Sequence, residues 1–218
     1  MSSKFIIIRV LLFVLLVVGT TSAMIAQDND FTTWTKFKVN HKIDSRFAVS
    51  GDLELRTEDD MSAIDRWGIS VGGDYSAFSF LKFEIGYETH YRNLGEIGWK
   101  FRHRYRIGAT ASFRYQWLKM SLRERFQQTF DRGESETRLR SRLKLGYAPQ
   151  KGIVSPYFSI EIYQSLDDAP FWRTARLRYR PGIEIDLTKR WSLDAFYCYQ
   201  YESSRGKHIA GVEVGYSF

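Results

Sequence analysis

The chain has 218 residues, a length that suits one domain. Its 6 Trp, 13 Tyr and 16 Phe argue against intrinsic disorder, and its single cysteine, Cys198, excludes both an intramolecular disulfide framework and a cysteine-based zinc cluster. The net charge is +7, and the mean hydropathy of −0.35 excludes a bundle of membrane helices.

Residues 1–26 are predicted to form a secretory signal peptide. Lys4 and Arg9 supply the positive start, and the apolar run 10–18 follows. This run is too short to cross a bilayer as a helix, which takes about 20 apolar residues. No later segment is apolar enough to span a membrane as a helix.

Cleavage of this signal fits after Ala23 or after Ala26, and we favour Ala26. Gln27 is then the first residue of the mature chain, whose net charge falls to +5 because two cations leave with the signal. The alternative is an uncleaved membrane anchor. A secretory signal also means that the protein leaves the cytoplasm.

The remainder of the chain alternates between apolar and polar residues with period two. In residues 46–57, for example, Phe47 and Leu53 hold odd positions while Asp52 and Glu54 hold even positions, which is typical of a strand with one apolar and one charged face. The same pattern predicts ten strands, at 46–57, 63–75, 80–90, 98–113, 117–130, 136–147, 153–164, 171–187, 191–202 and 208–218.

The connections and the aromatic residues indicate a membrane barrel rather than a soluble sandwich. Short turns are expected near 76–79, 114–117, 148–152 and 188–190, alternating with longer loops near 58–63, 91–97, 131–136, 165–170 and 203–207. Aromatic residues gather at both sets of strand ends, as the two interfaces of a bilayer select. We therefore predict an all-β fold for residues 46–218, a transmembrane antiparallel up-and-down β-barrel of about 10 strands (10–12).

Some segments fit this barrel less simply. Residues 31–40, within the N-terminal segment 27–45, also alternate and make an eleventh candidate that an even strand number leaves without a place. They are a partial strand, a periplasmic cap or one half of an unrecognised pair. Glu124, Pro156 and Pro181 interrupt the pattern and are expected at bulges or near a rim.

The chain ends at Phe218, with Tyr216 in phase before it. This ending resembles the C-terminal signal read by the outer-membrane barrel assembly machinery, although Gly211 and Gly215 do not match its usual glycine spacing. We expect an outer-membrane location in a Gram-negative cell, with outer-membrane lipids and the assembly machinery as partners.

Short charged motifs recur inside the predicted strands. They are Leu53-Glu-Leu-Arg56, Leu122-Arg-Glu-Arg125, Arg138-Leu-Arg-Ser-Arg-Leu-Lys-Leu-Gly-Tyr147, Pro156-Tyr-Phe-Ser-Ile-Glu161, Arg176-Leu-Arg-Tyr-Arg-Pro-Gly182 and Tyr197-Cys-Tyr-Gln200. Together they resemble the domain-of-unknown-function family 2490, predicted outer-membrane proteins mostly of Bacteroidota, over about residues 28–218. The resemblance implies an outer-membrane location and brings no established activity, so no catalytic residue is carried over.

The polar phase of each strand must face the lumen, because lipid rejects it. Eleven cations lie on the three strands 98–113, 117–130 and 136–147, and the wall opposite holds Asp52, Glu54, Asp194, Glu202 and Glu213. The predicted lumen charge network comprises Arg102, Arg104, Arg106, Arg123, Arg125, Arg138, Arg140, Arg142, Lys144, Arg176, Arg178, Asp52, Glu54, Glu84, Glu161, Glu184 and Glu213.

A barrel of about ten strands is narrow enough for side chains to fill. We therefore interpret the network as a plug of Arg/Lys–Glu/Asp pairs that reach across the lumen. The alternative is a small anion-selective pore or an anion-binding barrel, because the cations outnumber the facing carboxylates. Small anions are then a further partner.

An enzyme is the second alternative, an outer-membrane protease or lipase with its site at the outer rim. His90, His208, Asp59, Asp60 and Asp65 are expected near that rim, but no protease motif accompanies them. A lipase would need a Ser–His pair on the lipid face, where His103 has no evident serine partner. The sequence shows no motif for a metal, a cofactor or a nucleic acid, so we expect neither a cofactor nor an enzyme.

Overall fold

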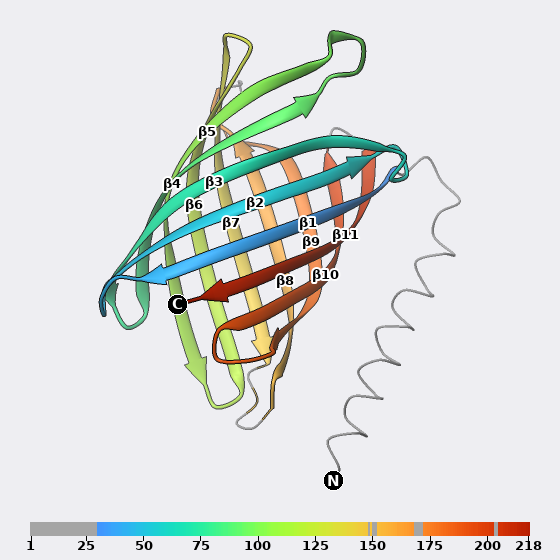
Figure 1. Cartoon of the computed structure of the whole chain (residues 1–218). Coiled ribbons are helices and arrows are strands. Elements are labelled where there is room, and N and C mark those ends of the chain that lie inside the picture. Colours follow the sequence, from blue (N-terminus) through green and yellow to red (C-terminus); the bar gives the residue numbers. More distant parts are fainter. Residues whose placement is uncertain (1–29, 148, 150–151, 168–171, 203–204) are drawn as a thin grey trace.

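The computed structural model describes residues 30–147, 149, 152–167, 172–202 and 205–218, so the predicted signal peptide and its cleavage site lie outside the described residues. The described chain forms eleven strands and one short 3-10 turn at Gly95–Ile97 (Figure 1). The strands are β1 Asp30–Lys42, β2 Phe47–Glu58, β3 Ala63–Phe78, β4 Leu81–Asn93, β5 Trp99–Tyr115, β6 Leu118–Asp131, β7 Glu134–Tyr147, β8 Val154–Ser165, β9 Arg173–Asp186, β10 Trp191–Glu202 and β11 Arg205–Ser217. In these parts of the chain, no helix is long and apolar enough to cross a membrane.

The strands close into a barrel in which each pairs with its neighbours in the sequence, and β1 pairs with β11. All pairs are antiparallel except β1–β11, which is parallel from Asp30↔Lys207 to Asn40↔Ser217. The arrows of these two strands lie side by side and point the same way in Figure 1. An odd number of alternating strands gives the first and last the same direction, so this seam must be parallel.

The expectation that an even strand number is needed is therefore wrong, and the segment 31–40 has its place. It is neither a partial strand nor a cap, because β1 is a full strand of 13 residues in the wall between β2 and β11. The barrel therefore begins before residue 46.

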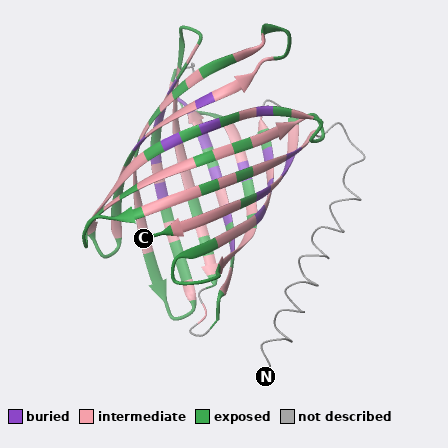
Figure 2. Ribbon diagram, in the orientation of Figure 1, coloured by how far each residue is buried: buried purple, intermediate pink, exposed green. Residues whose placement is uncertain are grey.

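Side chains alternate between the two sides of the wall, as strand geometry requires. On the outside, Leu53, Ile85 and Ile107 are 54%, 64% and 58% exposed. On the lumen side, Glu161 and Arg178 are only 3% and 6% exposed. Figure 2 shows the same alternation of exposed and less exposed residues along the strands. The outer surface is apolar and the interior is charged.

Two bands of contacting aromatic rings lie on the outside. Near one rim, Phe78 and Phe80 stack with ring centroids 5.6 Å apart. Near the other rim, Tyr91 contacts both Trp67 and Trp99, at 5.8 Å and 5.1 Å. The two bands agree with the prediction that aromatic residues gather at both sets of strand ends.

The connections made wholly of described residues differ less in length than the sequence predicts. At the rim where β11 ends, the C-terminal rim, they span 43–46, 79–80, 116–117 and 187–190. At the rim where β1 begins, the Asp30 rim, they span 59–62, 94–98 and 132–133. Strand pairing continues into the expected loops: Arg132 and Gly133, both with positive φ, close a two-residue hairpin.

Glu124 and Pro181 also differ from expectation, whereas Pro156 lies where the β7–β8 pairing has ended, near a rim. Glu124 keeps regular register in mid-strand on the outer face, where its carboxylate accepts a hydrogen bond of 2.6 Å from the Ser141 hydroxyl. Pro181 makes no bulge; it lies where the β9–β10 pairing pauses between Phe196↔Gly182 and Tyr199↔Tyr179 without a change of register. A missing N–H donor is thus accommodated by a local gap in the ladder.

Glycines on the lumen side make room for larger neighbours. A Cβ at Gly211 would enter the ring of Phe196, whereas a Cβ at Gly51, on the outer face, would meet nothing closer than 3.7 Å. We predict that Gly211→Ala lowers the free energy of unfolding by about 1–3 kcal/mol, because the ring has no free space to move into.

The measurement is the unfolding temperature of the detergent-solubilised barrel, read from its heat-modifiable mobility on a gel. Gly51→Ala is the matched control and should leave that temperature unchanged. Equal temperatures for the Gly211→Ala variant and the unsubstituted barrel would show that Phe196 is loosely packed.

Candidate functional site

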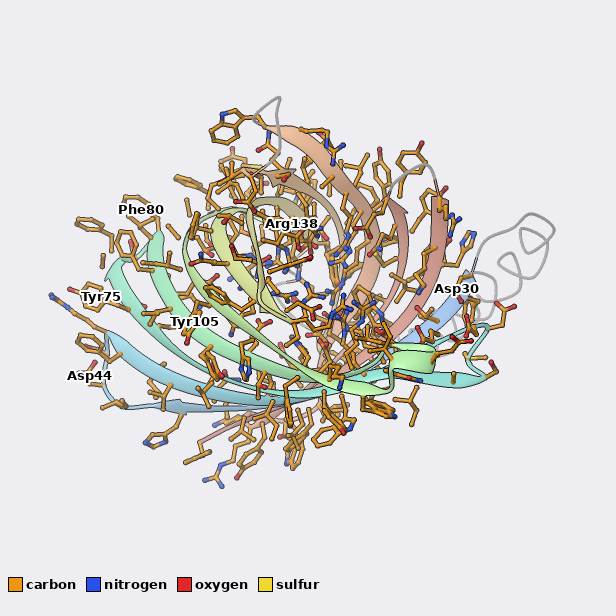
Figure 3. The ribbon with its side chains drawn as sticks, turned by 90° about the horizontal axis from the view of Figure 1, so that it is seen from above. Asp30, Asp44, Tyr75, Phe80, Tyr105 and Arg138 are labelled. Carbon is orange, nitrogen blue, oxygen red and sulfur yellow. The ribbon has the colours of Figure 1, made fainter. Side chains whose placement is uncertain are left out.

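The charged side chains converge inside the barrel. In the view from above, blue nitrogen atoms crowd the space enclosed by the strands, with Arg138 among the labelled residues (Figure 3). Three cavities lie in series along this lumen, with volumes of about 200 Å³ toward the Asp30 rim, 370 Å³ in the middle and 880 Å³ toward the C-terminal rim. The cavities share lining residues, which gather in two layers of side chains.

A layer of five side chains lies where the middle cavity meets the Asp30 rim cavity. This Trp34 layer consists of Trp34, Arg56, Arg104, Arg140 and Arg178, which line both cavities and come from five different strands. The guanidinium carbons of Arg56 and Arg178 lie 3.8 Å and 4.7 Å from the centre of the indole ring. Stacking of cations on an aromatic face stabilises such contacts, so Trp34 anchors the layer.

A second layer lies where the middle cavity meets the C-terminal rim cavity. The residues that line both cavities form this Tyr157 layer: Lys38, Arg142, Lys144, Tyr157, Glu184, Asp194 and Glu213. Lys144 binds Glu184 at 2.5 Å and lies 3.7 Å above the Tyr157 ring. The Tyr157 hydroxyl donates to Asp194 at 2.8 Å.

One part of the lumen wall is apolar. Phe196, Cys198 and Ile209, on β10 and β11, form a buried cluster against which Trp34 packs. Arg180 covers this cluster, with its guanidinium carbon 3.4 Å from the centre of the Phe196 ring. The inward-facing aromatic residues thus serve as surfaces for arginine.

Each of the seventeen predicted network residues has an oppositely charged partner within 4.0 Å. The closest partners are Arg102 with Glu136, Arg104 and Arg106 with Glu88, Arg123, Arg140, Arg142 and Arg178 with Glu161, Arg125 with Glu84, Arg138 with Glu136, Lys144 with Glu184, Arg176 with Glu202, Asp52 with Lys36, Glu54 with Arg56, and Glu213 with Arg180.

These pairs join nearby strands and do not reach across the lumen as expected. Arg104 binds Glu88 on the adjacent strand at 3.0 Å, and Glu213 binds Arg180 at 3.2 Å, two strands away. The physical reason is that a long side chain lying along the wall meets a neighbouring carboxylate before it reaches the centre. The pairs brace the wall strand by strand.

Several partners lie outside the network predicted from the sequence. Glu88 binds Arg104 and Arg106, Arg180 binds Asp194 and Glu213, and Lys36 binds Asp52 and Glu54. The aromatic rings of Trp34 and Tyr163 stack with arginines. All five occupy the polar phase of their strands, a signal present in the sequence. The aromatic pair was missed because aromatic residues were assigned to the outer face.

Glu161 is shared by four arginines. Arg140 donates to both of its oxygens at 2.6 Å and 2.8 Å, while Arg123, Arg178 and Arg142 approach to 3.3 Å, 3.6 Å and 3.8 Å. Four guanidinium groups therefore surround one buried carboxylate. The cluster carries excess positive charge.

The predicted assembly signal lies at the seam. Phe218 donates its N–H to the Asn40 carbonyl at 3.1 Å and accepts from the Lys42 N–H at 3.3 Å, while its ring lies 5.9 Å from that of Tyr216. These contacts fasten the last residue beside β1. Recognition of Tyr216 and Phe218 by an assembly machinery stays a prediction.

The residues considered for an enzyme site are not brought together. His90 lies inside the lumen, 3.7 Å from a Glu54 oxygen, whereas His208 lies on the outer face and bonds the Tyr197 hydroxyl. Asp65 pairs with Arg92 at 3.1 Å. Within the described ranges there is no group of three or more His, Cys, Asp or Glu residues that could hold a metal ion.

The two remaining rim residues, Asp59 and Asp60, lie in the turn between β2 and β3, both with positive φ. Asp60 accepts a hydrogen bond of 3.0 Å from the Phe31 N–H. On the outer face, His103 bonds the Tyr87 hydroxyl at 2.6 Å rather than a serine. These contacts hold turns and neighbouring strands together.

The closed sheet and its interior define a β-barrel with a buried salt-bridge network. The model of the family described as "Protein of unknown function (DUF2490)" matches residues 31–209, so the chain belongs to that family, and the resemblance seen in the sequence is confirmed. Among solved structures, the chain is similar to the rhombohedral crystal form of the NanC porin, with 12% identity and a TM-score of 0.48, over 83% of this chain and 93% of that one. No curated protein matches the chain.

The pair between Arg140 and Glu161 offers a direct test of the network. Their side chains are 16% and 3% exposed, and breaking a buried pair typically costs about 3–5 kcal/mol. We predict a loss of that size for Arg140→Leu and a larger loss for Glu161→Leu, which leaves four guanidinium groups without their carboxylate. The double variant should lose less than the sum of the two, as measured by unfolding of the detergent-solubilised barrel.

The exposed pair of Arg132 and Asp131, 3.4 Å apart at the Asp30 rim, is the control for this cycle. Arg132→Leu should cost less than about 1 kcal/mol, because water screens a surface pair. Additive losses in the Arg140–Glu161 cycle, or losses as small as the control's, would mean that water also screens the lumen pairs.

Proposed function

We propose that the protein is an outer-membrane β-barrel whose lumen is closed to solutes by its own side chains. The outer surface supports the location, and the Trp34 layer is the observation that carries the closure. The charge network in this proposal is structural: it stabilises the wall and fills the lumen.

An outer-membrane location suits the outer face. Apolar side chains such as Leu53 and Ile85 would be unfavourable in water at this exposure, whereas lipid accepts them. The two bands of aromatic contacts fit the two interfaces of a bilayer. Glu124 is the exception on this face, and its hydrogen bond with Ser141 offsets part of the cost of a carboxylate in lipid.

Closure follows from the composition of the two layers. The Trp34 layer places an indole ring and four guanidinium groups at one level of a narrow barrel. The Tyr157 layer adds a second level of paired charges and a phenol ring. A solute that passes would have to separate cation–π contacts and ion pairs at both levels.

A small anion-selective path is the second candidate. It is favoured by the lining of the middle cavity, where twelve cations face six carboxylates. The cations are Lys36, Lys38, Arg56, Arg104, Arg106, Arg123, Arg125, Arg140, Arg142, Lys144, Arg178 and Arg180, and the carboxylates are Asp52, Glu54, Glu88, Glu184, Asp194 and Glu213. Such a field would favour anions over cations.

The proposed location and assembly partner can be tested through Phe218. We expect the protein in the outer-membrane fraction, and we expect Phe218→Ala to reduce its level there severalfold while the folded variant loses only about 1.5–3 kcal/mol, the burial of one side chain. Alanine keeps the backbone hydrogen bonds to Asn40 and Lys42.

Phe113→Ala, which removes another aromatic ring near the C-terminal rim, is the control and should reach normal levels. A normal level for Phe218→Ala would refute the assembly signal. A soluble periplasmic protein would refute the location.

The proposed closure can be tested by conductance in planar bilayers. We expect the unsubstituted barrel to show no stable steps, and we expect Trp34→Ala to produce steps that favour anions, because the layer loses its anchor and the cations remain. Trp191→Ala removes an indole from the outer face, where Trp191 contacts Tyr216, and should stay silent. Stable steps from the unsubstituted barrel would favour the open path instead.

A further inference from the structure

Four arginines form a compact block on two adjacent strands. Arg123 and Arg125 of β6 lie directly opposite Arg142 and Arg140 of β7 in the register. Like charges placed opposite each other on a sheet destabilise it. A block of this kind therefore needs negative charge from elsewhere.

The protein supplies only part of that charge. Glu84 binds Arg125 at 2.5 Å, and Glu161 is shared by the other three arginines of the block. Arg142 has the weakest share, since its Nε lies 3.8 Å from Glu161, beyond hydrogen-bond distance. Four positive charges thus meet two carboxylates, one of which Arg178 also approaches.

Donor groups in the block also lack acceptors. The Nε atoms of Arg123, Arg140 and Arg142 are buried, and none has a hydrogen-bond partner among the described residues. Arg123 itself is only 9% exposed. Leaving a buried charged donor unsatisfied is costly, so the block is destabilised by unmet hydrogen bonds as well as by like charge.

The space beside the block suits a small ligand. All four arginines line the middle cavity, whose volume of about 370 Å³ leaves room for an oxyanion of a few atoms with water around it. Phosphate reaches this cavity from the larger one at the C-terminal rim and has to pass only the Tyr157 layer, whereas a solute that crosses the barrel has to pass both layers. Guanidinium groups present paired N–H donors that match the oxygens of phosphate-type anions.

We propose that the block formed by Arg123, Arg125, Arg140 and Arg142 binds a small, doubly charged oxyanion of the phosphate class. Two charges on the ligand balance the two that the carboxylates leave uncompensated. The oxygens accept from terminal guanidinium N–H groups of Arg123 and Arg142, two residues that line the middle cavity. This proposal goes beyond closure of the lumen, because the site can be occupied whether the barrel is closed or conducting.

Binding is measured on the full mature barrel in detergent, with inorganic phosphate as the probe and sodium chloride holding the ionic strength constant. At about 100 times its dissociation constant, phosphate should raise the unfolding temperature by on the order of 5 °C. Glycerol phosphate is a second arm. A similar shift with it means that the cavity also takes phosphate esters, whereas no shift restricts the site to the free ion.

Arg142→Gln and Arg123→Gln should each weaken phosphate binding about tenfold or more by calorimetric titration. In chloride alone, Arg142→Gln should unfold at the same temperature as the unsubstituted barrel or higher, because it relieves like-charge repulsion. Lys119→Gln removes a cation that lines the C-terminal rim cavity outside the block, and it should leave phosphate binding unchanged.

Three results would overturn the site. Phosphate and chloride could stabilise the barrel equally, Lys119→Gln could weaken binding as much as Arg142→Gln, or both block variants could bind phosphate normally. The second result would mean that phosphate senses only the general field of the lumen. These experiments measure binding and unfolding, not conductance. They can therefore refute the phosphate site without refuting the proposed closure, and conductance can refute the closure without refuting the site.

Discussion

Closing a sheet into a ring sends every second side chain into a narrow interior, and in this barrel most of those side chains are charged. Each guanidinium group must then find an acceptor at short range. The barrel meets this demand along its wall: Arg104 finds Glu88 on the next strand, and Arg180 finds Asp194 on the next strand in the other direction. The ion pairs therefore link neighbouring strands on the lumen side, as the backbone hydrogen bonds do within the sheet.

Where carboxylates are scarce, aromatic rings take part of their role. Trp34, Tyr163 and Phe196 all face inward and each carries a guanidinium group within 5.1 Å of its ring centre. An aromatic face attracts a cation without adding a second charge that must itself be compensated. This combination gives the lumen dense packing and keeps its net charge positive.

The sequence could predict strands and faces because period-two alternation depends only on local geometry and solvent. It placed Leu53 outside and Glu54 inside, and the structure agrees. It could not predict the parallel seam, since 31–40 reads as a strand without naming its partner, nor the partner of each arginine. Those depend on the stagger between strands and on side-chain reach, neither of which a single strand records.

Glu124 shows the same limit on the outer face. Its parity predicts a lipid-facing carboxylate, and the cost of such a group led to the expectation of a bulge. In the structure the strand is regular, and the hydroxyl of Ser141 on the adjacent strand β7 donates a hydrogen bond to the carboxylate. A neighbour brought close only by folding removed the need for a backbone irregularity.

The parallel seam also bears on how the barrel can form. His41 and Phe218, which touch at the seam, are 177 residues apart in the chain, so the ring closes only after the last strand has been made. Until then β1 has one edge without its partner, and an unpaired apolar edge invites pairing with other chains. Contacts between distant residues also form slowly, because a long loop must be closed first. Losing even the final strand would thus leave an open sheet with two free edges rather than a smaller barrel.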